Sequence, residues 1–232
     1  MPATFVIVGA SLAGGTAAAT LRQDGFDGDV ILIGEEPHPP YERPPLSKQY
    51  LRGEVPFEKA LVRPSGFYQE HGIDTRFGVA ARRIANVQGI YAAGDVANHY
   101  HPVFQKRMRV EHWQNAMQQS AAAARSMLDR GRPYDAVHWF WSDQYDVNLQ
   151  YAGFHQAWDQ VVVRGHPDTR TFIAFYLSQG RIDAVAALNR GNDVRRVMPL
   201  IKARTAVDPR RLADDDVDLR SLVDGRFSGA RA

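Results

Sequence analysis

The stretch TFVIVGASLAG, residues 4–14, decides the fold of the first part of this chain. The apolar run Thr4–Val8 predicts a buried parallel strand, and the small residues from 13 to 22 predict a helix directly after it. A second apolar run, Asp29–Ile33, predicts another buried strand. A strand, a helix and a parallel strand in this order predict an α/β protein whose first part is Rossmann-like.

The turn between the first strand and the helix has the spacing of a dinucleotide-binding motif. It reads Gly9-Ala10-Ser11-Leu12-Ala13-Gly14, which is GxGxxG with serine at the middle position. Such a turn allows a pyrophosphate to approach the backbone at the N-terminus of a helix. Glu35 follows the second strand about 20 residues on, where a carboxylate binds a ribose hydroxyl. An ordinary strand–helix turn is the alternative.

Two further motifs bear on which dinucleotide would bind. In PYERPPLSK, residues 40–48, rigid prolines frame Arg43 and Lys48. Arg43 could clamp a phosphate, and Lys48 could place a cation beside a flavin ring and favour its anionic reduced form. A proline-stiffened surface loop with two solvated cations is the alternative. Gly94-Asp95 could place an acid against a ribitol chain, or it could cap a helix.

The composition excludes several classes of function. The 232 residues include no cysteine, which excludes disulfides, zinc–thiolate sites and Fe–S clusters held by this chain. Electron transfer would therefore need an organic cofactor. A net charge of +2 gives no argument for nucleic acid as a partner. Neither a membrane span nor a signal peptide is apparent, so the expected location is cytoplasmic and no membrane partner is predicted.

The second half of the chain has the pattern of an antiparallel sheet. Ser178-Gln179-Gly180 predicts a hairpin turn, and Asn192-Asp193 predicts the start of a helix that Pro199 would kink. The last stretch, residues 206–232, is polar and acidic and is expected to wrap loosely. The strands predicted here are 147–153, 160–164, 171–177 and 181–188, and the remaining elements predicted earlier in the chain are helices at 64–71 and 110–128 and strands at 73–77 and 89–95.

Two aromatic clusters have open interpretations. His99-Tyr100-His101 suggests a metal-binding pair, but no third ligand is evident in the sequence, and no metal site is predicted. Trp139-Phe140-Trp141 could belong to the core or could contact a cofactor.

Five motifs in this order resemble the FAD-dependent ferredoxin reductases, the family of the rubredoxin and putidaredoxin reductases. They are VIVGASLAG, PYERPPLSK, IYAAGDVAN, RVEHWQNA and FWSDQYDVNLQYAG. The resemblance implies an FAD-binding domain at residues 1–132, in two segments 1–85 and 86–132, and an α+β reductase C-terminal domain with a mainly antiparallel sheet at 133–232.

The resemblance also implies roles for individual residues. Ala13 would lie in the pyrophosphate turn, and Glu35 and Ala81 would contact the adenosine part of FAD. Arg43 and Lys48 would line the flavin side, with Lys48 and Trp141 as the catalytic residues. Gly94, Asp95, Glu111, His112 and Trp113 would lie along the ribitol and the flavin pocket, and Trp141 would lie over the flavin or nicotinamide face.

The chain departs from the family at one place. Members carry an NAD-binding insertion, whereas residues 77–81 here are followed almost directly by residues 89–91, and no second Gly-rich fingerprint occurs. The expected function is electron transfer through flavin with impaired or absent direct NAD(P)H use, in a protein classed as an oxidoreductase. The expected partner is an acidic ferredoxin-type carrier, and a homodimer is left open. A non-catalytic scaffold and a flavoenzyme acting on another small molecule are the alternatives.

Overall fold

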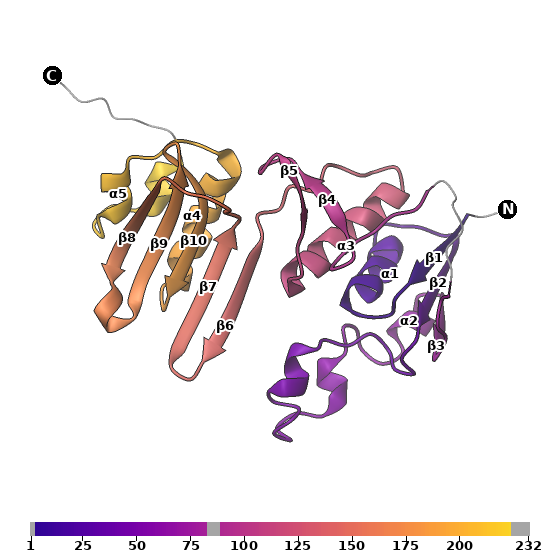
Figure 1. Cartoon of the computed structure of the whole chain (residues 1–232). Coiled ribbons are helices and arrows are strands. Elements are labelled where there is room, and N and C mark those ends of the chain that lie inside the picture. The colour runs from indigo at the N-terminus through magenta and orange to yellow at the C-terminus, as the bar shows by residue number, and fades with distance from the viewer. Residues whose placement is uncertain (1–2, 83–88, 224–232) are drawn as a thin grey trace. The chain divides into compact units, whose positions relative to one another are not determined.

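The computed structural model describes residues 3–82 and 89–223 of the chain. The chain forms two compact units, drawn with their element labels in Figure 1. The first unit comprises Met1–Asn98 and Arg109–Tyr134, and the second comprises His99–Met108 and Asp135–Ala232. Each unit is therefore built from two separate segments of the chain.

The first unit contains a three-stranded parallel sheet of the predicted Rossmann-like type. Its strands lie in the order β1 (Thr4–Val8), β2 (Asp29–Gly34) and β3 (Ile73–Phe77). The helix α1 (Leu12–Gln23) lies against β1 and β2 and also against α3 (Trp113–Met127). Between β2 and β3 the chain forms short helical turns, which are η1 (Pro44–Ser47), η2 (Phe57–Ala60) and α2 (Phe67–Glu70). The three predicted strands 4–8, 29–33 and 73–77 are confirmed.

The core of the first unit lies between the sheet and α1. Ile7, Leu32 and Ile73 are buried on the strands, and Leu21 is buried on the helix. Glycine and alanine along α1 allow the helix to approach both the sheet and α3 closely. The other face of β1 is open, with Val6 52% exposed and Val8 49% exposed.

The predicted strand at 89–95 is wrong. Residues 90–93 form no strand, and the glycines on either side of them, Gly89 and Gly94, have φ angles of +80° and +78°. Ile90 and Tyr91 are exposed, so no buried neighbour strand holds this segment extended. The helix predicted from residue 110 begins instead at Trp113, because the backbone is still extended at His112.

The second unit contains an antiparallel sheet, as predicted, and this sheet has five strands. Gln179 and Gly180 both have positive φ angles, which the predicted hairpin turn between its last two strands requires. The helix α4 (Gly191–Ala203) packs on this sheet and buries Val194, Val197 and Ile201. The strands follow the order β6 (Trp139–Gln144), β7 (Val147–Gly153), β10 (Arg181–Leu188), β9 (Thr171–Ser178) and β8 (Gln160–His166).

Three features of the second unit differ from the sequence analysis. β6 and the two-stranded hairpin β4 (Asn98–His101) and β5 (Lys106–Arg109) were not predicted. α4 begins at Gly191 rather than being capped by Asn192-Asp193, because Asp193 lies in its first turn and pairs with Arg190 at 2.6 Å.

The C-terminal stretch does not wrap loosely in its described part. It forms α5 (Pro209–Ala213) and η4 (Leu219–Leu222), and Leu212, Leu219 and Leu222 join the core of the second unit. In the sequence these leucines are widely spaced and separated by acidic residues. Their apolar pattern was therefore not apparent from the sequence. Residues 224–232 lie outside the described part of the chain. Among the helices that the structure describes, none combines the length and the apolar character that crossing a membrane requires.

Candidate nucleotide-binding site

The turn from β1 into α1 has the geometry of a pyrophosphate cradle. Gly9 has a φ of +104°, and its N–H donates to the Ile33 carbonyl at 2.9 Å. A Cβ on Gly14 would lie 1.9 Å from the Gly9 carbonyl oxygen, so only glycine fits there. Ser11 is the N-cap of α1, is exposed, and makes no side-chain capping bond. The N–H groups of the first turn of α1 are therefore available to an anion, and the turn fits a dinucleotide.

The proline-rich loop is anchored on the same helix. A Cβ on Gly15 would lie 2.7 Å from both Pro40 Cβ and Tyr68 Oη. Burial raises the pKa of Tyr68 to about 12. The close contact between Gly15 and Pro40 therefore places the start of the PYERPPLSK motif beside α1.

Gly94 brings the Gly-Asp motif to the beginning of α1. A Cβ built on it would lie 3.2 Å from the Ala13 Cβ, and its N–H donates to Gln119 Oε1 at 2.9 Å. Asp95 follows in an exposed position, and its backbone carbonyl accepts from Arg109 at 3.1 Å. The structure therefore brings Gly94 and Asp95 to the cradle, although the strand that was expected to carry them does not form.

The motif RVEHWQNA meets the proline-rich loop at Glu42. The Trp113 indole N–H donates to the Glu42 carboxylate, which lowers the pKa of Glu42, but burial has the larger effect and raises that pKa. Burial also lowers the pKa of His112, against the opposing charge of Asp95. Glu111 is exposed. The sequence analysis did not single out Glu42, although it stands between Pro40 and Pro44 and beside Arg43.

Arg43 and Lys48 have different surroundings. Arg43 pairs with Glu36 at 3.0 Å, and Tyr41 donates to the other Glu36 oxygen at 2.5 Å. The hydrogen bond from Tyr41 and, after it, the Arg43 charge lower the pKa of Glu36. Lys48 is exposed, and its ammonium makes no hydrogen bond or ion pair with residues of the described chain. Lys48 is therefore the cation of this loop that is available to a ligand.

Three more predicted site residues lie in described parts of the chain. Glu35 follows β2 and is exposed, and Ala81 is exposed beyond β3. Trp141 lies on β6 of the second unit, where its ring stacks on Trp139 at 4.9 Å and stays 39% exposed. Its partial exposure argues against a purely buried core role.

Two family models match the chain. Residues 3–84 match the pyridine nucleotide-disulphide oxidoreductase model, and residues 139–223 match the reductase C-terminal model. The first range contains the cradle, and the second contains the antiparallel sheet. The chain is a homologue of the ferredoxin reductases.

Proteins of known role support this relationship. The ferredoxin–NAD(+) reductase component of an anthranilate 1,2-dioxygenase system of Burkholderia cepacia is 35% identical over 212 residues, which are 91% of this chain and 47% of that protein. The ferredoxin reductase subunit of a 5,5'-dehydrodivanillate O-demethylase of Sphingobium is 42% identical over 60% of this chain and 34% of that protein. This ferredoxin reductase homologue thus spans less than half the length of these relatives.

Solved structures share the fold of the homologue. A ferredoxin reductase for the CYP199A2 system of Rhodopseudomonas palustris superposes with a TM-score of 0.80 at 21% identity, over 95% of this chain and 99% of that chain. The covalent putidaredoxin reductase–putidaredoxin complex gives 0.81 at 18% identity, over 97% of this chain and 99% of that chain. At these identities the likeness shows the fold.

Proposed function

We propose that this chain binds FAD in its first unit and acts as a flavoprotein oxidoreductase that transfers electrons to a ferredoxin-type carrier. The β1–α1 turn carries the proposal, because Gly14 approaches the Gly9 carbonyl so closely that no side chain fits and α1 points its first N–H groups outward. The relatives named as ferredoxin reductases support the choice of FAD over other dinucleotides.

Different residues of the first unit would contact different parts of the cofactor. Gly9, Ser11 and Gly14 would hold the pyrophosphate, Glu35 the ribose, and Asp95 the ribitol. Lys48 and Trp113 would lie on the flavin side, with Glu42 orienting the indole of Trp113 through its hydrogen bond. FAD, when bound, supplies the redox chemistry that side chains lack, since it accepts electron pairs and releases single electrons.

The proposed electron source is not a bound nicotinamide nucleotide. A ferredoxin–NAD(P)(+) reductase of Sphingomonas aligns over 402 positions, covering 97% of that protein and 94% of this 232-residue chain, so long stretches of the relative have no counterpart here. The single Gly-rich fingerprint in the sequence is the one at residues 9–14. We therefore propose that the NAD-binding insertion is absent and that a protein or another small molecule delivers the electrons.

The cofactor can be tested with a titration of FAD into the purified chain. Flavin absorbance should remain with the protein, and the melting temperature should rise with FAD concentration. Asp95→Ala should weaken binding by about tenfold or more, because a charged hydrogen-bond acceptor is lost. Asp27→Ala is the matched control, since Asp27 is also an exposed aspartate of the first unit. A protein that stays colourless in excess FAD would exclude the proposal.

The electron source can be tested with the FAD-loaded protein in an anaerobic cuvette. Dithionite should bleach the flavin band, whereas NADH and NADPH should bleach it far more slowly. Rapid bleaching by either nucleotide would contradict the proposed loss of nicotinamide use without contradicting FAD binding.

Exposed arginines of the second unit are candidates for contact with an acidic carrier. Arg195 and Arg210 are exposed, whereas Arg196 and Arg204 already pair with Asp193 and Asp183. Reversing the charge of Arg195 and Arg210 should slow transfer to an acidic ferredoxin more strongly at low salt than at high salt.

A scaffold without redox activity is the second candidate function, and the open valines of β1 favour it. Val6 and Val8 would be covered by a partner, including a second copy of the chain in a homodimer. This candidate predicts that Asp95→Ala leaves assembly and melting temperature unchanged with or without FAD. An FAD-dependent stabilisation that Asp95→Ala removes would exclude it.

A further inference from the structure

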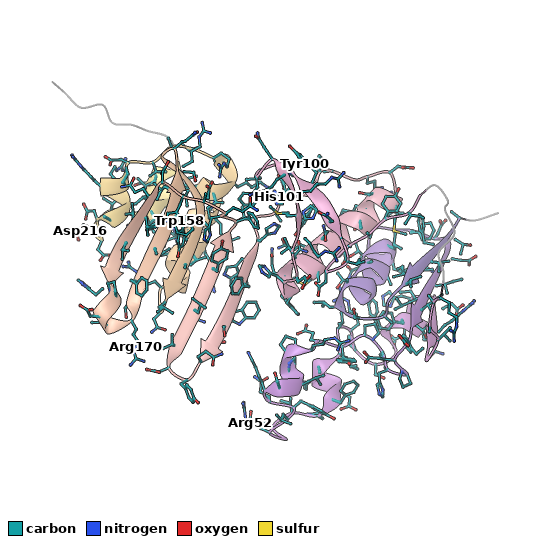
Figure 2. All side chains as sticks on the ribbon, viewed as in Figure 1. Arg52, Tyr100, His101, Trp158, Arg170 and Asp216 are labelled. Atoms are coloured by element: carbon teal, nitrogen blue, oxygen red, sulfur yellow. The ribbon has the colours of Figure 1, made fainter. Side chains whose placement is uncertain are left out.

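Three histidines of the second unit converge although they come from two distant parts of the chain. His99 and His101 alternate on β4, so both imidazoles lie on one face, while Tyr100 between them is 56% exposed on the other. Figure 2 labels Tyr100 and His101 on this strand. His138 directly precedes β6. The ring centroids of His101 and His138 are 4.8 Å apart, and those of His99 lie 5.7 and 6.2 Å from them.

The potential ligand atoms of these rings are close together. One ring nitrogen from each histidine lies within 4.8 Å of the other two. A tetrahedral ion with metal–nitrogen bonds of about 2.0–2.1 Å needs its nitrogens about 3.3 Å apart. Side-chain rotations that close these gaps by about 1–1.5 Å would therefore complete the coordination.

The surrounding backbone orients the deepest ring. His101 is 0% exposed, and its Nε2 lies 3.0 Å from the Ala136 carbonyl oxygen. A carbonyl only accepts, so Nε2 carries the hydrogen and Nδ1 keeps a lone pair. Metal-binding histidines are held in this way, with the second ring N–H bonded to a backbone carbonyl. His138 is 1% exposed, and its Nε2 lies 2.8 Å from the Met108 sulfur.

The three histidines differ in burial. His99 is partly buried, whereas His101 and His138 are fully buried, so His99 is the proposed ligand nearest to solvent.

From this convergence we propose that His99, His101 and His138 bind a divalent transition-metal ion of the Zn²⁺ type. Three imidazoles without a thiolate or carboxylate suit Zn²⁺ and its neighbours Co²⁺, Ni²⁺ and Cu²⁺ rather than Mg²⁺ or Ca²⁺. The fourth position is left to water. The ion cross-links the β4–β5 hairpin to the start of β6, two segments separated by the whole of α3 in the sequence. This site belongs to the second unit and does not depend on FAD.

The test uses the full chain without a histidine tag, freed of metal by a chelator. Calorimetric titration with ZnCl₂ should give one ion bound per chain, and Co²⁺ should give the visible bands of a four-coordinate nitrogen site. Zn²⁺ should also raise the melting temperature. Binding without the Co²⁺ bands, or no saturable binding, would overturn the proposal.

The variants assign the ligands. His99→Gln should weaken Zn²⁺ binding by about tenfold or more and abolish the Zn²⁺-dependent rise in melting temperature. His99 is chosen because it is the least buried of the three, so its replacement leaves the fold intact; a circular dichroism spectrum checks this. His166→Gln, at an exposed histidine of the same unit, should bind Zn²⁺ as the unmodified chain does. Equal affinity in His99→Gln and the unmodified chain would contradict the assignment.

Discussion

The backbone N–H of Gly94 donates to the side-chain oxygen of Gln119 at 2.9 Å in the buried interior of the first unit. This hydrogen bond fixes the Gly-Asp motif to α3, while the closeness of Gly94 to Ala13 places the same motif against α1. One amide side chain thus joins the two halves of the proposed cofactor site.

Replacing Gln119 with alanine should loosen this connection. Gln119→Ala leaves the buried Gly94 N–H without its acceptor and should lower the free energy of unfolding by about 1–3 kcal/mol. It should also weaken FAD binding, because Asp95 is no longer held beside α1. Gln118→Ala, at the exposed neighbouring position of α3, should have a much smaller effect in the same denaturant titration. Equal effects of the two substitutions would contradict the role of Gln119.

Ser11 offers a test in which stability and binding change in opposite directions. An aspartate at the N-cap favours the helix, so Ser11→Asp should leave the chain without FAD equally stable or more stable. The same carboxylate would repel the pyrophosphate and should strongly reduce FAD affinity. Ser11→Asn, a neutral N-cap of the same shape, is the control and should retain more binding. Tight FAD binding by Ser11→Asp would place the pyrophosphate elsewhere.

Lys48 is expected to influence the potential of the bound cofactor. Removing a cation near the flavin disfavours the negatively charged reduced form, so Lys48→Met should make the midpoint potential more negative. Lys59→Met, at an exposed lysine of the same region, should leave the potential unchanged. The comparison is a redox titration against a reference dye, and identical potentials would remove Lys48 from the flavin side.

Tyr151 should make the second unit sensitive to alkaline pH. Burial raises the pKa of Tyr151 to about 12, and His155 contacts its hydroxyl at 2.8 Å. An unfolded tyrosine has its ordinary pKa of 10.0, so the stabilisation is complete below pH 10 and is lost as the pH rises toward 12. Tyr151→Phe should show a smaller loss of melting temperature over this range. Tyr145→Phe, at a fully exposed tyrosine, should follow the unmodified chain.

Arg164 should hold the C-terminal segment on the sheet. Its guanidinium is buried and donates to the Asp215 side chain at 3.1 Å and to the backbone carbonyls of Asp215 and Val217 at 3.0 and 2.8 Å. Arg164→Leu leaves the two carbonyls without this donor, whereas the Asp215 carboxylate keeps its contact with Arg190 at 2.6 Å, and the substitution should cost about 2–3 kcal/mol.

Limited proteolysis should detect this loss as faster cleavage between α5 and η4. Arg170→Leu is the control, because Arg170 is 65% exposed and its contact with Asp146 is 4.0 Å long. Figure 2 labels Arg170, and it labels Asp216 in the segment expected to be cut. Unchanged cleavage in Arg164→Leu would show that the buried leucines alone hold the segment.

The sequence by itself determined the elements whose signal is local. The strand Thr4–Val8, the glycine turn and the strand Asp29–Gly34 follow from apolar runs and from the need for small residues, because each depends on residues close in the chain. The strand predicted at 89–95 does not form, because a strand depends on pairing with a neighbour as well as on its own residues. Its residues have a strand-like pattern, but no described neighbour pairs with them.

Only the tertiary structure decided which distant groups meet. Trp113 donates to Glu42, Gly94 bonds to Gln119, and His138 joins His99 and His101, although nothing in the spacing along the chain indicates these pairs. Each contact is set by how a helix or hairpin packs on residues far away in the sequence. The cradle for a dinucleotide could therefore be predicted from eleven consecutive residues, whereas the three-histidine cluster existed only once the chain had folded.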